Sequence, residues 1–286
     1  MKITRFAPYL FVFLWSTGFV GAKYGLPFAD PFIFLALRVF VAAVILFLVA
    51  LFLNNPVAIA RRDIGKSALI GFFLHACYLG GVFFSIASGL SAGVAAVVTS
   101  IQPVLVSVLA VKVLGEKLKG LQIVGLFIGL TGVLLVLMPS FTREIPFIGF
   151  LAITVALIGS TTATLLQKKI GSGIPLVVGT AYQYLSAGLV LVAIAIATGE
   201  TSIQWSASFT LSFIWLVGAL SVGAVLLLLW LLNTGSAASV SSLFYLVPPA
   251  TAIEAYFLFG ESVNAQGAMG IAITALGVWM VIKAKS

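Results

Sequence analysis

The chain has 286 residues, of which 62% are hydrophobic and only 8% are charged, and its mean hydropathy is +1.25. These values lie outside the usual range of soluble globular domains, and no polar stretch is long enough to form a soluble domain of its own. The composition therefore indicates a membrane protein, and the formal net charge of +8 must be explained within that class.

Runs of apolar residues long enough to cross a bilayer recur along the chain. A hydrocarbon core of ~30 Å needs about 20 apolar residues per helix. Strands of a membrane barrel would alternate apolar and polar residues, whereas AVILFLVALFL at 43–53 is continuously apolar. We therefore expect an all-α membrane protein. Its ten predicted transmembrane helices are 6–25, 32–53, 67–88, 92–113, 120–138, 147–167, 175–197, 209–232, 236–257 and 265–282.

The basic residues follow the connections between these helices. With both termini in the cytoplasm, only Lys23 and Arg143 fall outside the cell, and Arg38 lies within a span. This positive-inside bias explains the charge without any nucleic-acid partner. The first apolar run stays a helix, because no signal-peptidase site precedes Lys23. The predicted cytoplasmic residues are Lys2, Arg5, Arg61, Arg62, Lys66, Lys112, Lys117, Lys119, Lys168, Lys169, Lys283 and Lys285.

The two halves repeat a series of small and polar residues at an offset of 145. An odd number of helices per half inverts the second half in the membrane, so we expect two inverted five-helix repeats, 1–142 and 143–286. The Gly-Glu turns would then face opposite sides, Glu116 the cytoplasm and Glu261 the exterior. The matched pairs include Ser91 with Ser236, Pro103 with Pro248, Gly115 with Gly260, Glu116 with Glu261, Gly125 with Gly270 and Gly132 with Gly277.

Several stretches resemble the EamA family of the drug/metabolite transporter superfamily. They are LFVFLWSTGFVGAKYGL and DPFIFLALR in the first two helices, and QPVLVSVLAVKVLGEKLKGLQIVGLFIGLTGV with its second copy. The resemblance implies a secondary transporter of small organic solutes that works by alternating access, often as an exporter in the bacterial inner membrane. Within the family the chain looks most like aromatic amino-acid exporters. A broad-specificity metabolite or drug exporter of the same fold is the alternative.

Prolines interrupt the fourth and ninth predicted helices near their centres. Pro103, Pro248 and Pro249 supply no N–H to the preceding turn, so the carbonyls of Thr99 and Tyr245 lose partners, as does that of Phe244. In lipid such groups need protein, ligand or water partners, and matched breaks point to a midplane site. We expect substrate contacts there from Thr99, Gln102 and Tyr245, with the prolines acting in gating. A purely structural kink is the alternative.

Two pairs of aromatic and polar residues complete the predicted substrate site. His75 lies near the centre of the third helix, where an ionisable group faces the bundle interior or water, and Tyr78 follows at i+3. Trp15 and Phe19 offer a stacking surface on the first helix. A hydrogen-bonded core histidine and simple packing of Trp15 are the alternatives.

Other polar residues in the spans have structural explanations. Snorkelling toward the outer headgroups accounts for Arg38, with attraction of carboxylates as the minority reading. Glu254, seven residues before Glu261, is a candidate for proton coupling. Thr161, Ser221 and Asn233 add uncharged hydrogen-bonding groups, for which polar helix packing is the alternative.

An enzyme is the rival class of function. GLSAG at 89–93 matches a nucleophile elbow around Ser91, but that motif needs a strand before its turn. No P-loop, metal-ligand cluster or dinucleotide fingerprint is present, so we expect no catalytic residue, metal or cofactor. GLFIG at 125–129 is typical of close helix packing inside the fold, and we expect a monomer in the bilayer that moves a small-molecule substrate.

Overall fold

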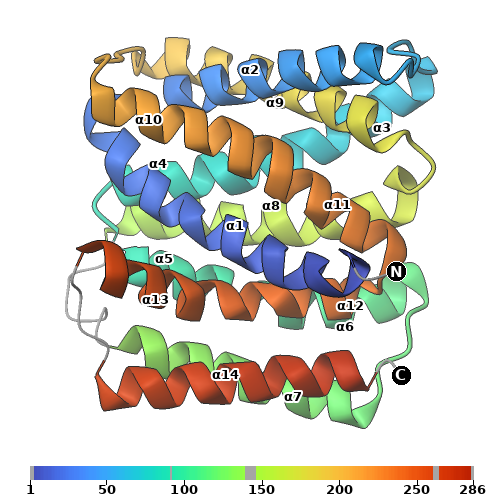
Figure 1. Ribbon diagram of the computed structural model, residues 1–286, viewed down its shortest axis with the longest axis vertical. Helices are drawn as coiled ribbons and strands as arrows, with labels where there is room; N and C mark the ends of the chain where they lie inside the picture. The colour runs from blue at the N-terminus through green and yellow to red at the C-terminus, as the bar shows by residue number, and fades with distance from the viewer. Residues whose placement is uncertain (1–2, 91, 139–145, 260–263, 285–286) are drawn as a thin grey trace.

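The computed structural model describes residues 3–90, 92–138, 146–259 and 264–284, and this part of the chain forms ten long helical segments (Figure 1). Eight of them are long and apolar enough to count as membrane spans. The prediction of an all-α, ten-helix frame is confirmed. The segments are α1 (Ile3–Gly25), α2 (Pro31–Phe52), α3–η2–α4 (Arg61–Gly71, Phe72–Gly80, Gly81–Ala87), α5–α6 (Ala92–Thr99, Gln102–Leu114), α7 (Gly120–Leu137), α8–η4 (Phe147–Leu166, Gln167–Gly171), α9 (Leu176–Thr198), α10–η5–α11 (Ala207–Trp215, Leu216–Ala224, Val225–Thr234), α12–η6–α13 (Ala237–Ser242, Leu243–Leu246, Val247–Phe259) and α14 (Ala265–Lys283).

The predicted ends agree with these bounds to within four residues except at the third helix. There α3 begins at Arg61 rather than at 67, because a polar first turn precedes the apolar run. Asp63 pairs with Lys66 at 2.6 Å in that turn. Hydropathy locates the apolar run, while hydrogen bonding extends the helix beyond it. The predicted boundary between the halves, 142 and 143, lies outside the described residues.

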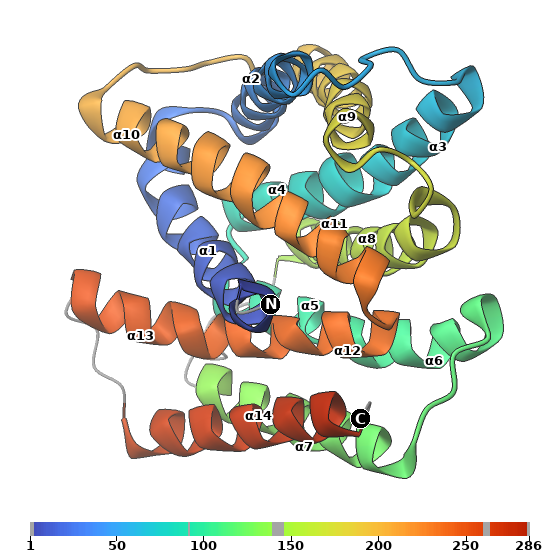
Figure 2. The ribbon, with the colours of Figure 1, turned by 45° about the vertical axis from the view of Figure 1, so that its right-hand side comes forward.

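The two halves pack as inverted equivalents. Helix α2 packs against its counterpart α9, and α7 against its counterpart α14, which form a separate layer in Figure 2. The first helix of each half contacts the third and fourth helices of the other: α1 lies against α10, η5 and α13, and α8 against η2, α4 and α6. These main inter-half contacts therefore come in symmetric pairs.

Glycines permit the closest of these contacts. A Cβ placed on Gly132 would collide with the backbone of Thr274, and one on Gly277 would collide with that of Gly129. The GLFIG stretch therefore lies at the α7–α14 contact inside the fold. Larger residues would separate these two helices and remove the packing that holds the layer together.

Both proline breaks are present. Helix α5 ends at Thr99 and α6 begins at Gln102, while η6 separates α12 from α13 just before Pro248. Side-chain hydroxyls near the breaks donate to helix carbonyls, as Ser107 does to Pro103 O at 2.7 Å and Ser241 to Ala237 O at 2.7 Å. The third helix of each half also contains a nine-residue π-helical segment, η2 and η5. No pattern of residues predicted these two π-helical segments, and such segments often mark functional sites.

The first Gly-Glu turn holds the two halves together. Gly115 ends α6 with φ +69°, a left-handed conformation that favours glycine. Glu116 Oε1 then accepts from Ala237 N at 2.8 Å, at the start of α12. From α8–η4, Lys168 Nζ donates to the carbonyls of Leu232 at 3.0 Å and Gly235 at 2.6 Å. We call these contacts of Glu116 and Lys168 with the α11–α12 turn the Glu116 clamp.

The second Gly-Glu pair, Gly260 and Glu261, and its expected neighbour Ser91 lie outside the described residues.

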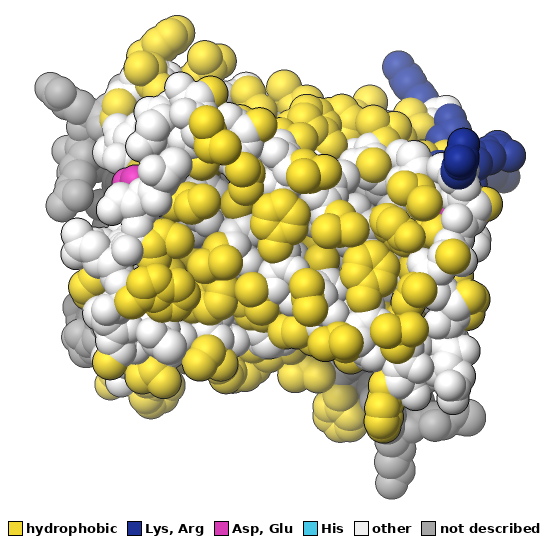
Figure 3. Space-filling model, turned by 90° about the horizontal axis from the view of Figure 1, so that it is seen from above, with side chains coloured by type: hydrophobic (Ala, Val, Ile, Leu, Met, Phe, Trp, Pro, Cys, Tyr) yellow, Lys and Arg dark blue, Asp and Glu magenta, His cyan; other side chains and the backbone are white. Residues whose placement is uncertain are grey.

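The two ends of the bundle differ in charge. Both chain termini lie at one end in Figure 1, and Figure 3 shows Lys and Arg side chains gathered at one end of the face it draws. We call the end formed by the first turn of α3 and the last turn of α6 the basic end; it carries Arg61, Arg62 and Lys112. At the opposite end Asp30 Oδ2 accepts from Ser202 N at 2.8 Å, which joins the α1–α2 and α9–α10 connections.

Candidate functional site

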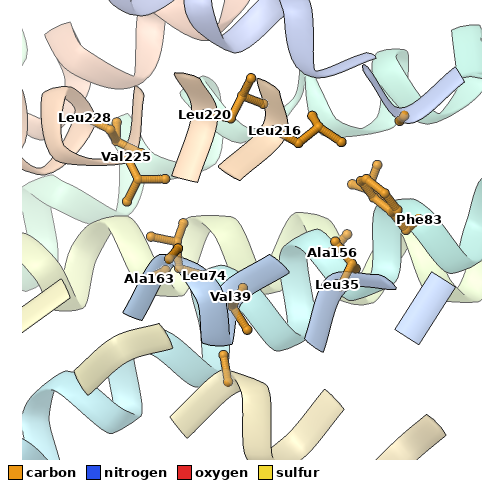
Figure 4. Packing of buried hydrophobic residues seen from close by; sticks show 14 of the residues in the cluster. Leu35, Val39, Leu74, Phe83, Ala156, Ala163, Leu216, Leu220, Val225 and Leu228 are labelled. Carbon is orange, nitrogen blue, oxygen red and sulfur yellow. The ribbon is translucent and has the colours of Figure 1, made fainter. Parts of the chain in front are cut away.

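A cavity with a volume of about 60 Å³ lies between the two halves. That is room for several waters, since one water needs roughly 10–15 Å³ on this measure. We call it the Arg38 cavity. Figure 4 labels four of its lining residues, Leu74, Phe83, Leu220 and Val225, among other buried hydrophobic side chains. Its lining is Trp15, Gly18, Ala22, Arg38, Leu74, His75, Tyr78, Leu79, Val82, Phe83, Ile86, Tyr184, Leu220, Ser221 and Val225.

Arg38 is the cation of this cavity and does not reach the headgroups. Its side chain is only 3% exposed, and Nε donates to Ser221 Oγ at 2.8 Å. Tyr184 Oη donates to the carbonyl of Ser221 at 2.5 Å and so ties α9 to η5 behind the guanidinium. No carboxylate of the described residues lies within ion-pair distance of Arg38. The snorkelling interpretation is therefore wrong, because packing of α2 against α9 and η5 directs the side chain inward.

His75 lies beside the guanidinium on η2. Its ring is 3% exposed and packs on Tyr184 with 4.4 Å between ring centroids. Its Nε2 has no hydrogen-bond partner among the described residues. Buried polar atoms usually have a hydrogen-bond partner, so this nitrogen is available to a ligand in the cavity. Tyr78, predicted with it, lines the same cavity.

Trp15 and Tyr78 form a partition. Their rings stack with centroids 6.5 Å apart and planes at 13°, and both line a second cavity of about 30 Å³. We call it the midplane chamber, since both proline breaks border it. Its other lining residues are Ala96, Thr99, Ser100, Gln102, Ser160, Phe244, Val247 and Pro248.

Four polar side chains of the midplane chamber donate hydrogen bonds within the protein. The hydroxyls of Thr99, Ser100 and Ser160 donate to carbonyls of their own helices. Gln102 Nε2 donates to Thr164 Oγ1 at 3.2 Å. The lone pairs of these hydroxyls and of the Gln102 amide oxygen can accept from a ligand, whereas the guanidinium of the Arg38 cavity can only donate.

The structure does not bring every predicted residue to these cavities. Tyr245 is fully buried outside both linings, and its ring packs against Gly129 of α7. Pro103 is buried in α6, and neither Pro103 nor Pro249 lines either cavity. The side chain of Phe19 lies outside the described part of the chain. The breaks therefore border the site, while Tyr245 belongs to the packing between halves.

The sequence analysis did not predict two aromatic residues that line the Arg38 cavity. Tyr184 and Phe83 are aromatic residues in largely apolar helices, so nothing in the sequence distinguished them from packing residues. Arg38 did carry a signal, because an arginine within a span faces protein or water far more often than lipid. Ser221, interpreted from the sequence as a polar packing residue, accepts the hydrogen bond of that arginine.

Comparison with known proteins agrees with this architecture. The model of the EamA-like transporter family matches the chain twice, over residues 6–138 and 147–283. The chain belongs to the EamA-like transporter family. The two matches correspond to the two repeats, and the family places the protein among multi-pass membrane transporters of the drug/metabolite transporter superfamily.

Individual relatives are distant. The transporter YvbV of Bacillus subtilis, itself uncharacterised, is 24% identical over 94% of this chain and 88% of its own length. A chloroplastic WAT1-related protein of Arabidopsis thaliana is 25% identical over 94% of this chain and 67% of its own. A solved crystal structure superposes with a TM-score of 0.82 at 17% identity and covers 99% of this chain and 98% of the other. That likeness concerns the fold alone.

Proposed function

We propose that this EamA-like transporter exports amino acids with aromatic or bulky apolar side chains across the bacterial inner membrane by alternating access. The observation that carries the proposal is Arg38, a buried cation that lines a cavity without a carboxylate partner. A charge in such a place is costly unless it is paired, and the carboxylate of a substrate would supply the pair. Guanidinium and carboxylate match in geometry as well as charge.

The walls of the Arg38 cavity support an apolar side chain. Trp15, Tyr78 and Phe83 contribute aromatic surface, and most other lining residues are aliphatic. An ammonium group on the substrate would lie against the ring faces of Trp15 or Tyr78, where a cation is attracted by the ring quadrupole. The unpaired Nε2 of His75 would provide one further hydrogen bond.

The direction of transport follows from charge bias and family resemblance. The positive-inside rule assigns the basic end to the cytoplasm, so the connection that carries Asp30 would face the exterior. Export is the direction that the resemblance implies. The largely apolar lining also fits a broader range of carboxylated solutes, which is the second candidate function.

The decisive experiment measures exchange in liposomes that contain the purified protein. Labelled phenylalanine should exchange faster than glutamate or lysine, and unlabelled tryptophan and methionine should compete with it. Phenethylamine, which has the same ring and amine but lacks the carboxylate, should compete poorly. Equal competition by phenethylamine, or faster exchange of glutamate or lysine, would contradict the proposal. Comparable exchange of phenylalanine and unrelated carboxylates would favour the broad exporter.

A further inference from the structure

A carboxylate within the membrane lies at the contact between the two repeats, away from the Arg38 cavity. Glu254 is five residues before the end of α13, about 8 Å along the helix at ~1.5 Å per residue. Its Oε1 is 2.5 Å from the hydroxyl of Ser16 on α1, and its Oε2 is buried without a partner. Ser16 itself has no exposed surface.

The hydrogens at this contact allow two arrangements. The Ser16 hydroxyl lies within bonding distance of two acceptors, Glu254 Oε1 at 2.5 Å and the carbonyl of Phe13 at 2.8 Å, but it has only one hydrogen. If Ser16 donates to Glu254, Oε1 acts only as an acceptor and the carboxyl group needs no proton of its own. If Ser16 donates to Phe13, the short contact requires a hydrogen on Glu254, which then donates to Ser16. The same positions of the heavy atoms therefore serve both protonation states.

We propose that Glu254 and Ser16 form a proton-binding site that couples proton movement to the transport cycle. This proposal rests on the proposed function. One proton would bind Glu254 from the aqueous phase on one side and leave, as the same proton, to the other side, with no other bond made or broken. Ionisable residues inside membrane proteins commonly serve such relays.

The position of Ser16 connects this proton site to the substrate cavity. Ser16 follows Trp15, which lines both the Arg38 cavity and the midplane chamber. One turn of α1 thus touches the substrate space on one side and Glu254 on the other. Because α1 and α13 belong to different repeats, the Ser16–Glu254 contact joins the two repeats. Thr251, also on α13, approaches Ser16 O at 3.5 Å.

The surroundings of Glu254 hold no described cation that would fix its charge. The elements packed against α13 are α1, α7, α14 and η6. Their described titratable side chains, with Tyr256 of α13 itself, are Tyr9, Tyr24, Tyr245 and Lys283. Lys283 lies in the last turn of α14, at the end of the bundle opposite to the C-terminal end of α13. Its ammonium group lies over the Trp279 ring. The side chains of Arg5 and Lys23 lie outside the described part of α1.

The test compares proton-driven uptake with exchange in liposomes. One pH unit corresponds to about a tenfold accumulation of solute for one coupled proton. Wild-type protein should approach that value for phenylalanine, and Glu254→Gln should lower the ratio of driven uptake to exchange several-fold. Glu254→Asp, which can still bind a proton, should restore the ratio. Asp63→Asn, a matched loss of a carboxylate at the basic end, should leave the ratio unchanged. An undiminished ratio in Glu254→Gln would overturn the proposal.

A second measurement is independent of the substrate. Infrared difference spectra of wild-type protein between high and low pH should show the carbonyl band of a protonated carboxyl group, and Glu254→Gln should lack it. Ser16→Ala should shift the pH at which the band appears and serves if Glu254→Gln does not fold. If phenylalanine is not exchanged at all, the proposed function fails while this band still tests the proton site. A spectrum that neither substitution changes would overturn the proposal.

Discussion

The Arg38 cavity has a much smaller counterpart in the second repeat. Residues 22 and 38 of that cavity correspond, at the offset of 145, to Gln167 and Gln183. These two glutamines line a pocket of only about 10 Å³ near the basic end, against about 60 Å³ at Arg38. Gln183 Nε2 donates to Gln167 Oε1 at 3.2 Å, so the amides fill the space that an alanine and an arginine leave open. We call it the Gln183 pocket.

The comparison shows that the arrangement of the helices and the polar residues in the pockets vary independently. The same helices cross in the same way in both repeats, yet one copy holds a cation beside open volume and the other holds two neutral amides beside almost none. The Glu116 clamp lies at the basic end, where the smaller pocket is found. In a transporter that alternates access, this arrangement corresponds to a state closed at the basic end, and we expect the two pockets to exchange volumes in the opposite state.

Making the two copies alike should have the largest effect. Arg38→Gln removes the cation, and a hydrogen bond to a charged group is worth about 1.5–3 kcal/mol, so the KM for phenylalanine exchange should rise roughly 10- to 150-fold. Arg38→Lys keeps the charge but loses the planar fork and should fall between the two. The matched change Gln183→Ala should leave KM within about twofold. An unaltered KM in Arg38→Gln would show that the cation does not read the substrate.

Opening the clamp should have an intermediate effect. Glu116→Ala leaves the first N–H groups of α12 without their acceptor, and loss of such a cap costs about 0.5–2 kcal/mol. The thermal transition in detergent should therefore fall. A cysteine at Thr180, in the Gln183 pocket of a Cys77→Ala background, should react faster with an impermeant reagent added from the basic end. Lys117→Ala, a change at the exposed neighbouring residue, serves as control, and equal reactivity in both variants would remove the clamp from the gate.

The smallest effect concerns pH at the opposite end. Partial burial, and secondarily the nearby Asp30, raise the pKa of Glu200 above its ordinary value of 4.5. The folded state therefore binds this proton more tightly than the unfolded state does, so its stabilising effect is complete below the ordinary value and is lost as pH rises through the raised one. The amides of Ser202 and Gln204, which donate to the α1–α2 connection, should lose protection from hydrogen exchange across that window.

Glu200→Gln should flatten this dependence of protection on pH. Asp63→Asn, far away at the basic end, should preserve it. A dependence that persists in Glu200→Gln would assign the effect to another group.

Local properties of the sequence were sufficient to predict the ten helices, the two breaks and the repeat. The length of an apolar run follows from bilayer thickness, so ten helices could be counted and bounded without any knowledge of their packing. A proline removes its N–H wherever it stands, which located the breaks before Pro103 and Pro248. The offset of 145 likewise required only residue identities. Charge at the helix ends predicts orientation by the same local logic.

The site was decided by tertiary packing. In a helix surrounded by lipid and protein, both faces are apolar, so the pattern cannot say which residues face the interior, and each π-helical segment further rotates the residues that follow it. Tyr184 and Phe83 line the cavity although no pattern predicted it. Tyr245, predicted to contact substrate, packs on Gly129 instead. The sequence identified Arg38 as a charge within a span. Only the packing of α2 against α9 and η5 directs its side chain to the cavity rather than to the headgroups, because Ser221 and the open volume there accommodate the guanidinium.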